Sequence, residues 1–230
     1  WKNSAVFKVI RYQCMHFSFG AGVEKMDSQA GLNLRRLRQN EWIRQLTKEV
    51  HLSYEQFIQP LFVVEGIQYR EPIAGLTKTF RETNDSVFSQ IDKDLEAGVR
   101  KFLLFYVPEE KKSHSFNHDF SCKNILELKK RYGNQIWLAV DVCLCSATTH
   151  GHCGILSDST ARQPSYNFQE SFVNNQLTVE ELSKAALQFA QAGADCVAPS
   201  DMMDGRIQAI RKVLDEKTLI MSYAAKFHSS

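Results

Sequence analysis

The chain has 230 residues, of which 43% are hydrophobic and 23% charged, and its formal net charge is only +2. This composition is ordinary for a globular protein with one sizeable core or at most two small ones. The near-neutral charge gives no electrostatic footprint for nucleic acid or a membrane surface, and no apolar run approaches the roughly 20 residues that span a bilayer. The sequence therefore predicts neither nucleic-acid nor membrane partners.

The N-terminal residues differ from the rest of the chain. Residues 1–25 have neither the basic start and apolar core of a secretory signal nor a clear helix or strand period. Met26 is followed by "DSQAGLNLRRLRQNEWIRQL", which is typical of a genuine protein start. We expect residues 1–25 to be a non-native upstream extension or disordered, with a real but unfamiliar arm as the alternative. We expect residues 26–58 to form an N-terminal arm.

From residue 60 onward, short apolar runs alternate with helical patterns. Five of these runs are nearly continuous in apolar residues, as in strands that are buried on both faces of a parallel sheet. The predicted strands are 60–66, 101–107, 136–143, 196–201 and 219–224.

Helices are predicted between these strands, at 87–97, 124–132, 178–192 and 206–217. In the third helix, Thr178 and Glu181 form a capping-box pattern, and Gly193 is placed to end the helix. Asp204 lies just before the fourth helix and is a possible cap.

The alternation of strands and helices predicts an α/β fold of stacked βα units with right-handed crossovers. Five such units within residues 59–230 fit either a doubly wound sheet or part of a TIM (β/α)8-barrel. The chain has no glycine-rich phosphate loop of the GxGxxG or GxxxxGK[ST] kind, which removes the strongest argument for a nucleotide-binding sheet. We therefore predict a partial (β/α) barrel.

Three cysteines and two histidines lie within residues 141–154, "DVCLCSATTHGHCG". This segment follows the third predicted strand, and in a βα-barrel the catalytic loops gather at the carboxyl ends of the strands. Six cysteines in the whole chain are too few and too unevenly spread for a disulfide scaffold. The cluster therefore favours a metal or catalytic role in a reducing, cytoplasmic setting.

The clustered cysteines can converge on one metal ion. Asp141, Cys143 and Cys145 project to the same side if the strand extends that far, and Cys153 can return from the loop. Three thiolates can bind Zn²⁺ while leaving the fourth position open, as a catalytic zinc site requires. A histidine as fourth ligand would instead make the zinc structural. The candidates for this fourth ligand are His150 and His152.

Two further strand ends carry polar residues. Lys226 follows the last predicted strand, and a desolvated lysine there has a lowered pKa, so that its neutral amine can form a Schiff base. The alternative is a lysine that snorkels to solvent. Ser200 and Asp201 lie at the end of strand 196–201, between the cysteine strand and the lysine strand. Here the alternative is an ordinary capped turn.

The segments "RRLRQN", "PLFVVEG", "LLFYVPEEKK", "DVCLC…HGHCGIL", "AGADCVAPSDMMDGRIQAIR" and "IMSYAAKFHSS" lie in this order over most of residues 34–230. In them the chain resembles the porphobilinogen synthase (5-aminolevulinate dehydratase) family. The resemblance implies a TIM-barrel lyase that condenses two 5-aminolevulinate molecules to porphobilinogen with loss of water, in haem and porphyrin biosynthesis. It also implies a homo-oligomer, which is an octamer in the family.

The resemblance also implies roles for single residues. The positions that match the family's catalytic zinc ligands are Cys143, Cys145 and Cys153, and this cysteine set implies the zinc-using type. Lys226 matches the Schiff-base lysine of the substrate site nearest the metal, and Asp141 and Ser200 match polar residues lining that site.

Some features depart from the family pattern. Ala147-Thr148 stands where the family usually has Tyr-Thr, and the loop 157–172 is longer than usual. The sequence ends at Ser230, before the lid and the second Schiff-base lysine of the family. We expect a divergent, C-terminally truncated member that is poorly active or inactive alone. The alternatives are a non-catalytic fragment with structural zinc and an aldolase-type Schiff-base barrel, which would leave the cysteines unexplained.

Overall fold

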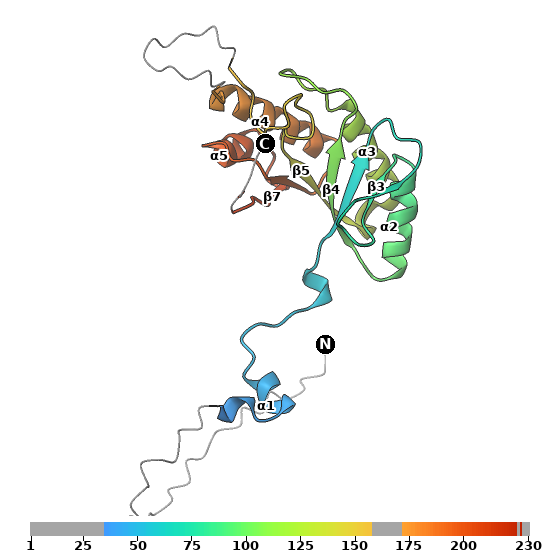
Figure 1. The fold of residues 1–230 in the computed structure, drawn as a ribbon, viewed down its shortest axis with the longest axis vertical. Helices are drawn as coiled ribbons and strands as arrows, with labels where there is room; N and C mark the ends of the chain where they lie inside the picture. Colours follow the sequence, from blue (N-terminus) through green and yellow to red (C-terminus); the bar gives the residue numbers. More distant parts are fainter. Residues whose placement is uncertain (1–34, 158–171, 225, 227–230) are drawn as a thin grey trace, which may run out of the picture. The chain divides into compact units, whose positions relative to one another are not determined.

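The structure is a computed structural model that describes residues 35–157, 172–224 and 226 (Figure 1). The predicted extension 1–25 and nearly all of the loop 157–172 lie outside the described residues. The chain divides into two compact units, Trp1–His51 and Leu52–Ser230. The domain boundaries that we place after residues 25 and 58 stay predictions.

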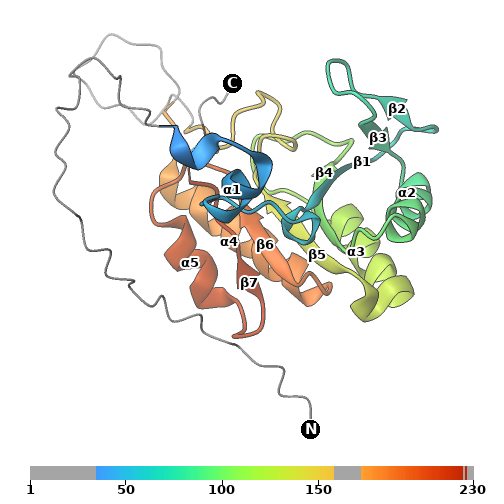
Figure 2. The same ribbon diagram turned by 90° about the horizontal axis from the view of Figure 1, so that it is seen from below.

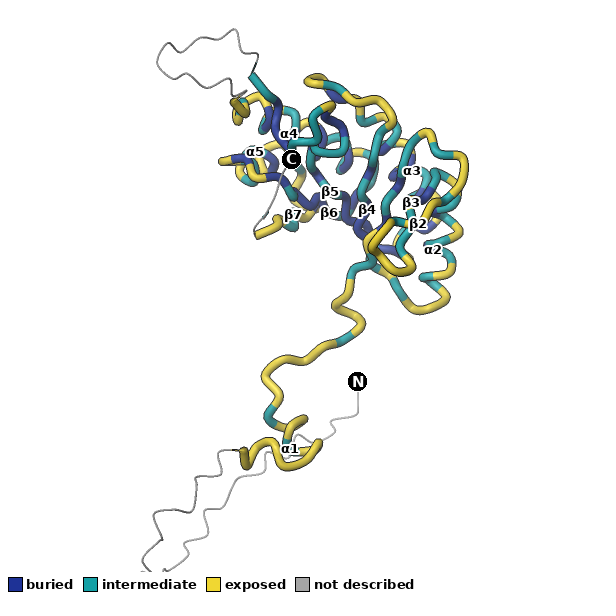
Figure 3. Tube along the Cα trace, viewed as in Figure 1, coloured by how far each residue is buried: buried dark blue, intermediate teal, exposed yellow. Residues whose placement is uncertain are grey.

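The described part of the first unit contains a 3-10 helix, η1 (Arg36–Arg38), and a short α-helix, α1 (Glu41–Leu46). The side chain of Asn40 caps α1 by accepting a hydrogen bond from the backbone N–H of Ile43 at 2.9 Å. None of the described residues of this unit is buried, and Figure 3 colours them mostly as exposed. This segment therefore has no core of its own within the described residues.

In the second unit, seven strands form one sheet in the order β2-β3-β1-β4-β5-β6-β7. The strands are β1 (Gln59–Val64), β2 (Glu71–Pro72), β3 (Phe80–Glu82), β4 (Lys101–Val107), β5 (Trp137–Val142), β6 (Cys196–Pro199) and β7 (Leu219–Ile220). Neighbouring strands are parallel, except that β2 pairs antiparallel with β3. The carboxyl ends of the parallel strands therefore lie along one edge of the sheet.

The helices of the described part of the second unit lie between these strands in the sequence, apart from η2, which precedes β1. They are η2 (Tyr54–Gln56), α2 (Ser86–Glu96), α3 (Asp119–Tyr132), η3 (Gly133–Gln135), α4 (Asn175–Gln191) and α5 (Arg206–Val213). Within the described residues, no helix combines the length and the apolar character that crossing a membrane requires.

The main core lies between the sheet and the helices α2–α5, which cover one face of it (Figure 2). Leu104 and Val140 from the strands pack there with Ile125 and Leu182 from the helices, and all four are fully buried. A smaller cluster lies on the other face of the sheet and consists of Leu103, Ala139, Cys196 and Ala198. Burial on both faces explains why these strands are continuous apolar runs in the sequence.

The five predicted strands are confirmed as β1, β4, β5, β6 and β7, but β7 has two residues instead of six. The backbone continues to pair beyond β7, because Met221 N donates to Val197 O at 2.9 Å and Tyr223 N donates to Pro199 O at 3.1 Å. The sequence pattern does not predict β2 and β3. Each has only two or three residues and carries charged side chains, so neither has the apolar run that marks a buried strand.

The predicted capping box of the third helix is wrong. Helix α4 begins at Asn175, and its cap is Asn174, whose side chain accepts from Leu177 N at 3.0 Å. Thr178 lies inside the helix, where its hydroxyl donates to the carbonyl of Asn174 and accepts from Ile155 N at 2.9 Å. The sequence pattern therefore mistakes Thr178 for a helix cap, although its hydroxyl bonds to the backbone of a neighbouring loop. The helix ends as predicted, with Gly193 at a φ of +109° just after it.

The predicted cap and length of the fourth helix are also wrong. Gly205, with a φ of +77°, precedes α5, and Asp204 makes no side-chain cap. Instead, the backbone N–H and carbonyl of Asp204 pair with the side-chain amide of Asn175. The helix ends at Val213, because Asp215 forms a separate turn by accepting from Thr218 N at 2.8 Å.

His118 immediately precedes α3, which begins five residues earlier than predicted. Its ring lies edge-on to Phe189, and among the described residues its Nε2 is buried without a hydrogen-bond partner. Burial, together with the positive charge of Lys184, lowers the pKa of His118 from 6.5 to about 4. The folded state therefore holds His118 as the neutral imidazole.

We expect His118 to make the fold sensitive to acid. The folded pKa lies below the unfolded value, so the stabilisation is complete above pH 6.5 and is lost as the pH falls towards 4. The H118L variant should lose less free energy of unfolding than the wild type between pH 7 and pH 4, by about 1–3 kcal/mol. Urea unfolding across this pH range measures the difference. H114L, which changes an exposed histidine, is the control, and equal acid sensitivity of both variants would contradict the prediction.

Candidate active site

The ends of β5, β6 and β7 bring the predicted site residues together. Asp141 on β5 is aligned with Ala198 on β6, and Ser200 N donates to Val142 O at 3.2 Å, just beyond the two strands. Parallel pairing of β6 with β7 directs the chain that contains Lys226 to the same edge. The predicted convergence of these three strand ends is therefore present in the structure.

The three predicted thiols contact one another. Cys153 is fully buried, and the side chain of Cys143 is hydrogen-bonded to those of Cys153 and Cys145. The bond to Cys145 raises the pKa of Cys143 to about 11, whereas the same bond lowers the pKa of Cys145 to about 7. Cys145 is therefore the thiol of this pair that more readily carries a negative charge.

The strand does not extend to Cys145, so the condition for Asp141, Cys143 and Cys145 to project to one side by strand alternation is not met. It ends at Val142, and Ala147 N donates to Leu144 O at 2.8 Å, which closes a turn. This turn brings Cys145 back against Cys143. The segment 143–154, called the thiol loop below, therefore assembles the thiols by turning rather than by strand alternation.

Lys226 points to the thiols, with its Nζ 3.3 Å from Cys143 Sγ. Burial lowers the pKa of Lys226, but the negative charge available at Cys143 and Cys145 outweighs it, so the net pKa is raised. The predicted lowering of this pKa is therefore wrong for the site as the structure describes it. The side chain is half-buried against the thiols and is not directed to solvent as a snorkelling lysine would be.

Asp141 lies beside this amine. Its carboxylate is hydrogen-bonded to the side chain of Ser200, and among the described residues its Oδ1 is buried without a partner. Burial raises the pKa of Asp141 to about 6, while the bond to Ser200 and the charge of Lys226 act in the opposite direction. The pKa of this carboxyl group is therefore near neutral pH, and its Oδ1 accepts no hydrogen bond from the described residues.

The loop histidines hold the backbone of the thiol loop. The Nδ1 of His150 accepts from His152 N at 3.1 Å, and the Nδ1 of His152 accepts from Gly154 N at 2.9 Å. The carbonyl of His152 in turn accepts from the Thr148 hydroxyl at 2.8 Å. Because the Nδ1 of each histidine is hydrogen-bonded to a backbone N–H, both side chains stabilise the fold of the thiol loop. This arrangement disfavours either histidine as a fourth metal ligand through Nδ1.

In the described part of the chain, no group of three or more His, Cys, Asp or Glu side chains is arranged so that it could hold a metal ion. The donor chemistry nevertheless fits zinc, since Cys143 is hydrogen-bonded to the other two thiols, and thiolates are among the soft ligands that this ion accepts. Because zinc binds the thiolate form of cysteine, metal binding here would release the S–H protons of these side chains.

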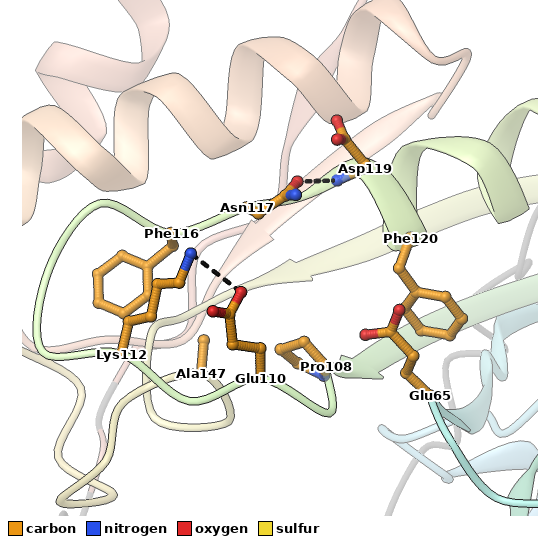
Figure 4. Close-up of a pocket in the computed structure, with 9 residues that line it drawn as sticks. All are labelled: Glu65, Pro108, Glu110, Lys112, Phe116, Asn117, Asp119, Phe120 and Ala147. Carbon is orange, nitrogen blue, oxygen red and sulfur yellow. Dashed lines mark hydrogen bonds and ion pairs between the residues drawn. The ribbon is translucent and has the colours of Figure 1, made fainter.

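A separate cavity of about 140 Å³ lies near the carboxyl ends of β1 and β4 (Figure 4). Its lining consists of Glu65, Pro108, Glu110, Lys112, Phe116, Asn117, Asp119, Phe120 and Ala147. None of the predicted catalytic or metal-binding residues is among them. The cavity is therefore not the predicted site, although Ala147 belongs to the thiol loop.

The sequence places Asp201 at the strand end beside Ser200 but gives it no role in the site, and it does not single out Tyr223. The side chain of Asp201 is fully buried, its Oδ1 accepts from Met203 N at 2.7 Å, and its Oδ2 forms an ion pair with Arg206 at 3.1 Å. The pKa of Tyr223 is raised by burial and by the charge of Asp141, which places this ring near the carboxylate. The sequence signals that point to them are the position of Asp201 directly after Ser200 and that of Tyr223 three residues before Lys226.

Comparison with known proteins shows which family the chain belongs to. Residues 32–230 match the protein family described as delta-aminolevulinic acid dehydratase. The chain belongs to this family. The chain is 41% identical over 204 residues to the delta-aminolevulinic acid dehydratase of Ruminiclostridium josui, covering 85% of this chain and 93% of that protein. The family prediction made from the sequence is confirmed.

Longer members of the family give the same result. Identity is 39% to the dehydratase of Methanothermus sociabilis and 33% to that of Bacillus subtilis, and the matches cover 86% and 88% of this chain. They cover only 60% and 61% of those two proteins. The chain therefore spans about three fifths of the length of these relatives.

A solved structure of the family has the same fold. It is delta-aminolevulinic acid dehydratase (porphobilinogen synthase) from Toxoplasma gondii in complex with the reaction product porphobilinogen. The match has a TM-score of 0.74 at 32% identity and covers 86% of this chain and 55% of that chain. The predicted α/β fold, part of a (β/α) barrel, is confirmed.

Proposed function

We propose that the chain carries one substrate site of a porphobilinogen synthase, the enzyme that condenses two 5-aminolevulinate molecules to porphobilinogen with loss of water. Its family membership supports this activity, which belongs to haem and porphyrin biosynthesis. The observation that carries the proposal is the position of Lys226, whose amine lies 3.3 Å from Cys143 and close to Asp141. An amine, an acid and three thiols thus meet at one sheet edge.

In this proposal, Lys226 forms a Schiff base with the ketone of one 5-aminolevulinate. The neutral amine attacks the carbonyl carbon, and the carbonyl oxygen leaves as water after accepting protons. The resulting iminium draws electrons from the neighbouring carbon, which can then lose a proton and form the new bond. Because the reaction needs the unprotonated amine, the charge of the thiols next to Lys226 controls how much of it is available.

Asp141 and Ser200 are proposed to line the same substrate site. Asp141, with a pKa of about 6, can give a proton to the leaving oxygen and take one back near neutral pH. The hydroxyl of Ser200 is bonded to this carboxylate and orients it. The Oδ1 of Asp141 has no partner among the described residues and is available to accept a hydrogen bond from an ammonium or hydroxyl group of the substrate.

We propose that Cys143, Cys145 and Cys153 hold Zn²⁺, with a position left open for the substrate or water. Bound there, the ion would supply Lewis acidity and would offset the thiolate charge next to Lys226. The thiols of the described residues are all free of disulfides, which suits a reducing cytoplasm. A homo-oligomer, an octamer as in the family, is the proposed assembly.

Trapping the Schiff base tests the function. The chain is folded with Zn²⁺, incubated with 5-aminolevulinate and sodium borohydride, and digested for mass spectrometry. We expect a reduced adduct on Lys226, because its amine is the one next to the acid and the thiols. The K226M variant should give no adduct at this position, and K217M, which changes an exposed lysine, should label like the wild type.

The outcome separates the two main hypotheses. A folded, zinc-loaded chain that is not modified at Lys226 would favour a non-catalytic fragment with structural zinc. Labelling spread equally over several exposed lysines would show ordinary amine chemistry and would also contradict the proposed site.

A further inference from the structure

The loop that follows β4 pairs with the thiol loop outside the sheet. Lys112 N donates to Ala147 O at 2.8 Å, and Thr149 N donates to Lys112 O at 3.1 Å. These bonds accompany an isolated parallel bridge between Lys112 and Thr148. The backbone of Lys112 therefore fixes the part of the thiol loop that lies beyond Cys145.

The neighbouring residue, Lys111, reaches the same loop with its side chain. Its Nζ donates to the carbonyl of Ser146 at 2.6 Å and also to the carbonyl of Pro108, so one ammonium group joins the two loops. The hydroxyl of Ser146 donates to Tyr106 O at 2.9 Å. Ser146, which directly follows Cys145, is thus held through both its carbonyl and its side chain.

This anchoring acts where the sheet gives no support. Strand β5 ends at Val142, so no ladder hydrogen bonds fix the backbone of Cys145. A metal site nevertheless requires its ligands to be held within about 0.5 Å of the productive geometry. Hydrogen bonds from a charged donor are among the stronger ones, and a lysine bridging two carbonyls supplies two of them.

We propose that Lys111 is a positioning residue for the thiol site, acting through Ser146 to set the position of Cys145. The inference rests on the proposed function, because it gives the thiols a metal to bind. The hydrogen bonds of the Lys111 side chain that the structure describes go to backbone carbonyls and not to the thiols. Its effect is to restrict the backbone at 145–146, so that Cys145 stays within reach of Cys143.

The test compares K111M with K112M. The side chain of Lys112 points to Glu110, at 2.9 Å (Figure 4), and its loop bonds come from the backbone, which the substitution leaves in place. Two measurements are made on each folded chain. Co²⁺ is titrated by its thiolate charge-transfer absorption, and hydrogen exchange is followed in a peptide covering 144–149.

For K111M we expect the Co²⁺ affinity to fall about 10-fold, as is typical when a group that supports metal ligands is lost. The same variant should exchange faster at Ala147–Thr149 in the metal-free chain. K112M should match the wild type in both measurements, and K111R should recover part of the loss because it keeps a charged donor.

Unchanged exchange or unchanged Co²⁺ affinity in K111M would overturn the proposal, and so would an equal loss in K112M. If the wild-type chain itself gives no thiolate absorption with Co²⁺, the zinc part of the proposed function fails. Hydrogen exchange in the metal-free chain then decides alone whether Lys111 orders the loop. Failure of the two ideas is therefore distinguishable.

Discussion

Replacing Cys145 with serine is expected to weaken Zn²⁺ binding by at least about 100-fold, since even the loss of groups that only support ligands costs 10- to 100-fold. Cys145 is the thiol whose pKa is lowered, to about 7, so it is the first of the pair to become a thiolate. A serine hydroxyl stays protonated near neutral pH and is a poor ligand for a borderline-soft ion. The variant would keep two of the three proposed sulfur ligands.

Co²⁺ titration followed by competition with Zn²⁺ measures this affinity. Cys122→Ser is the matched control, because Cys122 lies on α3 and is not in contact with the three thiols in the described structure. We expect this control to bind as tightly as the wild type. Equal affinities of the two variants would show that the metal, if bound, is held elsewhere.

The strands that position the site were predictable because burial on both faces leaves a plain sequence signal. β4 has the predicted bounds, and β5 and β6 fall within theirs, since each is a continuous apolar run between polar segments. β3 gives no such signal. Its residue Glu82 is a buried charge, and the partner that makes this possible, Arg70, lies twelve residues away across a turn.

Helix boundaries failed where a side chain bonds to something distant in sequence. Thr178 has the right residue type and spacing for a cap, but its hydroxyl accepts a hydrogen bond from the backbone N–H of Ile155, just after the thiol loop. Asp204 also has the right type, but its backbone is held by Asn175. Both contacts depend on the tertiary fold, so capping rules applied to the local sequence select the wrong residue.

The sequence predicted that the candidate site residues lie close together, but it did not predict the direction in which the pKa of Lys226 shifts. Strand ends that are neighbours in a parallel sheet must approach one another, which is why Lys226 meets Cys143. The pKa of Lys226 depends instead on distances to charged sulfur atoms, and these follow from the turn at Leu144–Ala147. Desolvation alone predicts a lowered pKa, whereas the structure gives a raised one.

Replacing Glu82 with alanine is expected to cost about 3–5 kcal/mol of unfolding free energy, the usual cost of removing one partner of a buried ion pair. The side chain of Glu82 is 2% exposed, and its carboxylate accepts from Arg70 at 2.7 Å and from the Ser86 hydroxyl at 2.6 Å. Arg70 also stacks on the ring of Phe80, 3.9 Å from its centroid. Loss of Glu82 leaves this guanidinium half-covered without its counter-charge and removes the tie between β3 and the start of α2.

The same sheet supplies a matched control. Glu71 pairs with Arg81 at 3.7 Å, but both side chains are more than half exposed, so the E71A variant should cost less than about 1 kcal/mol. Urea unfolding of the two variants compares one buried and one exposed glutamate on adjacent strands. Because the contribution of an ion pair to stability depends on how deeply it is buried, the losses of unfolding free energy in E82A and E71A should differ several-fold. Similar costs for E82A and E71A would mean that water screens the Arg70–Glu82 pair, and that β3 is held by its pairing with β1 and β2.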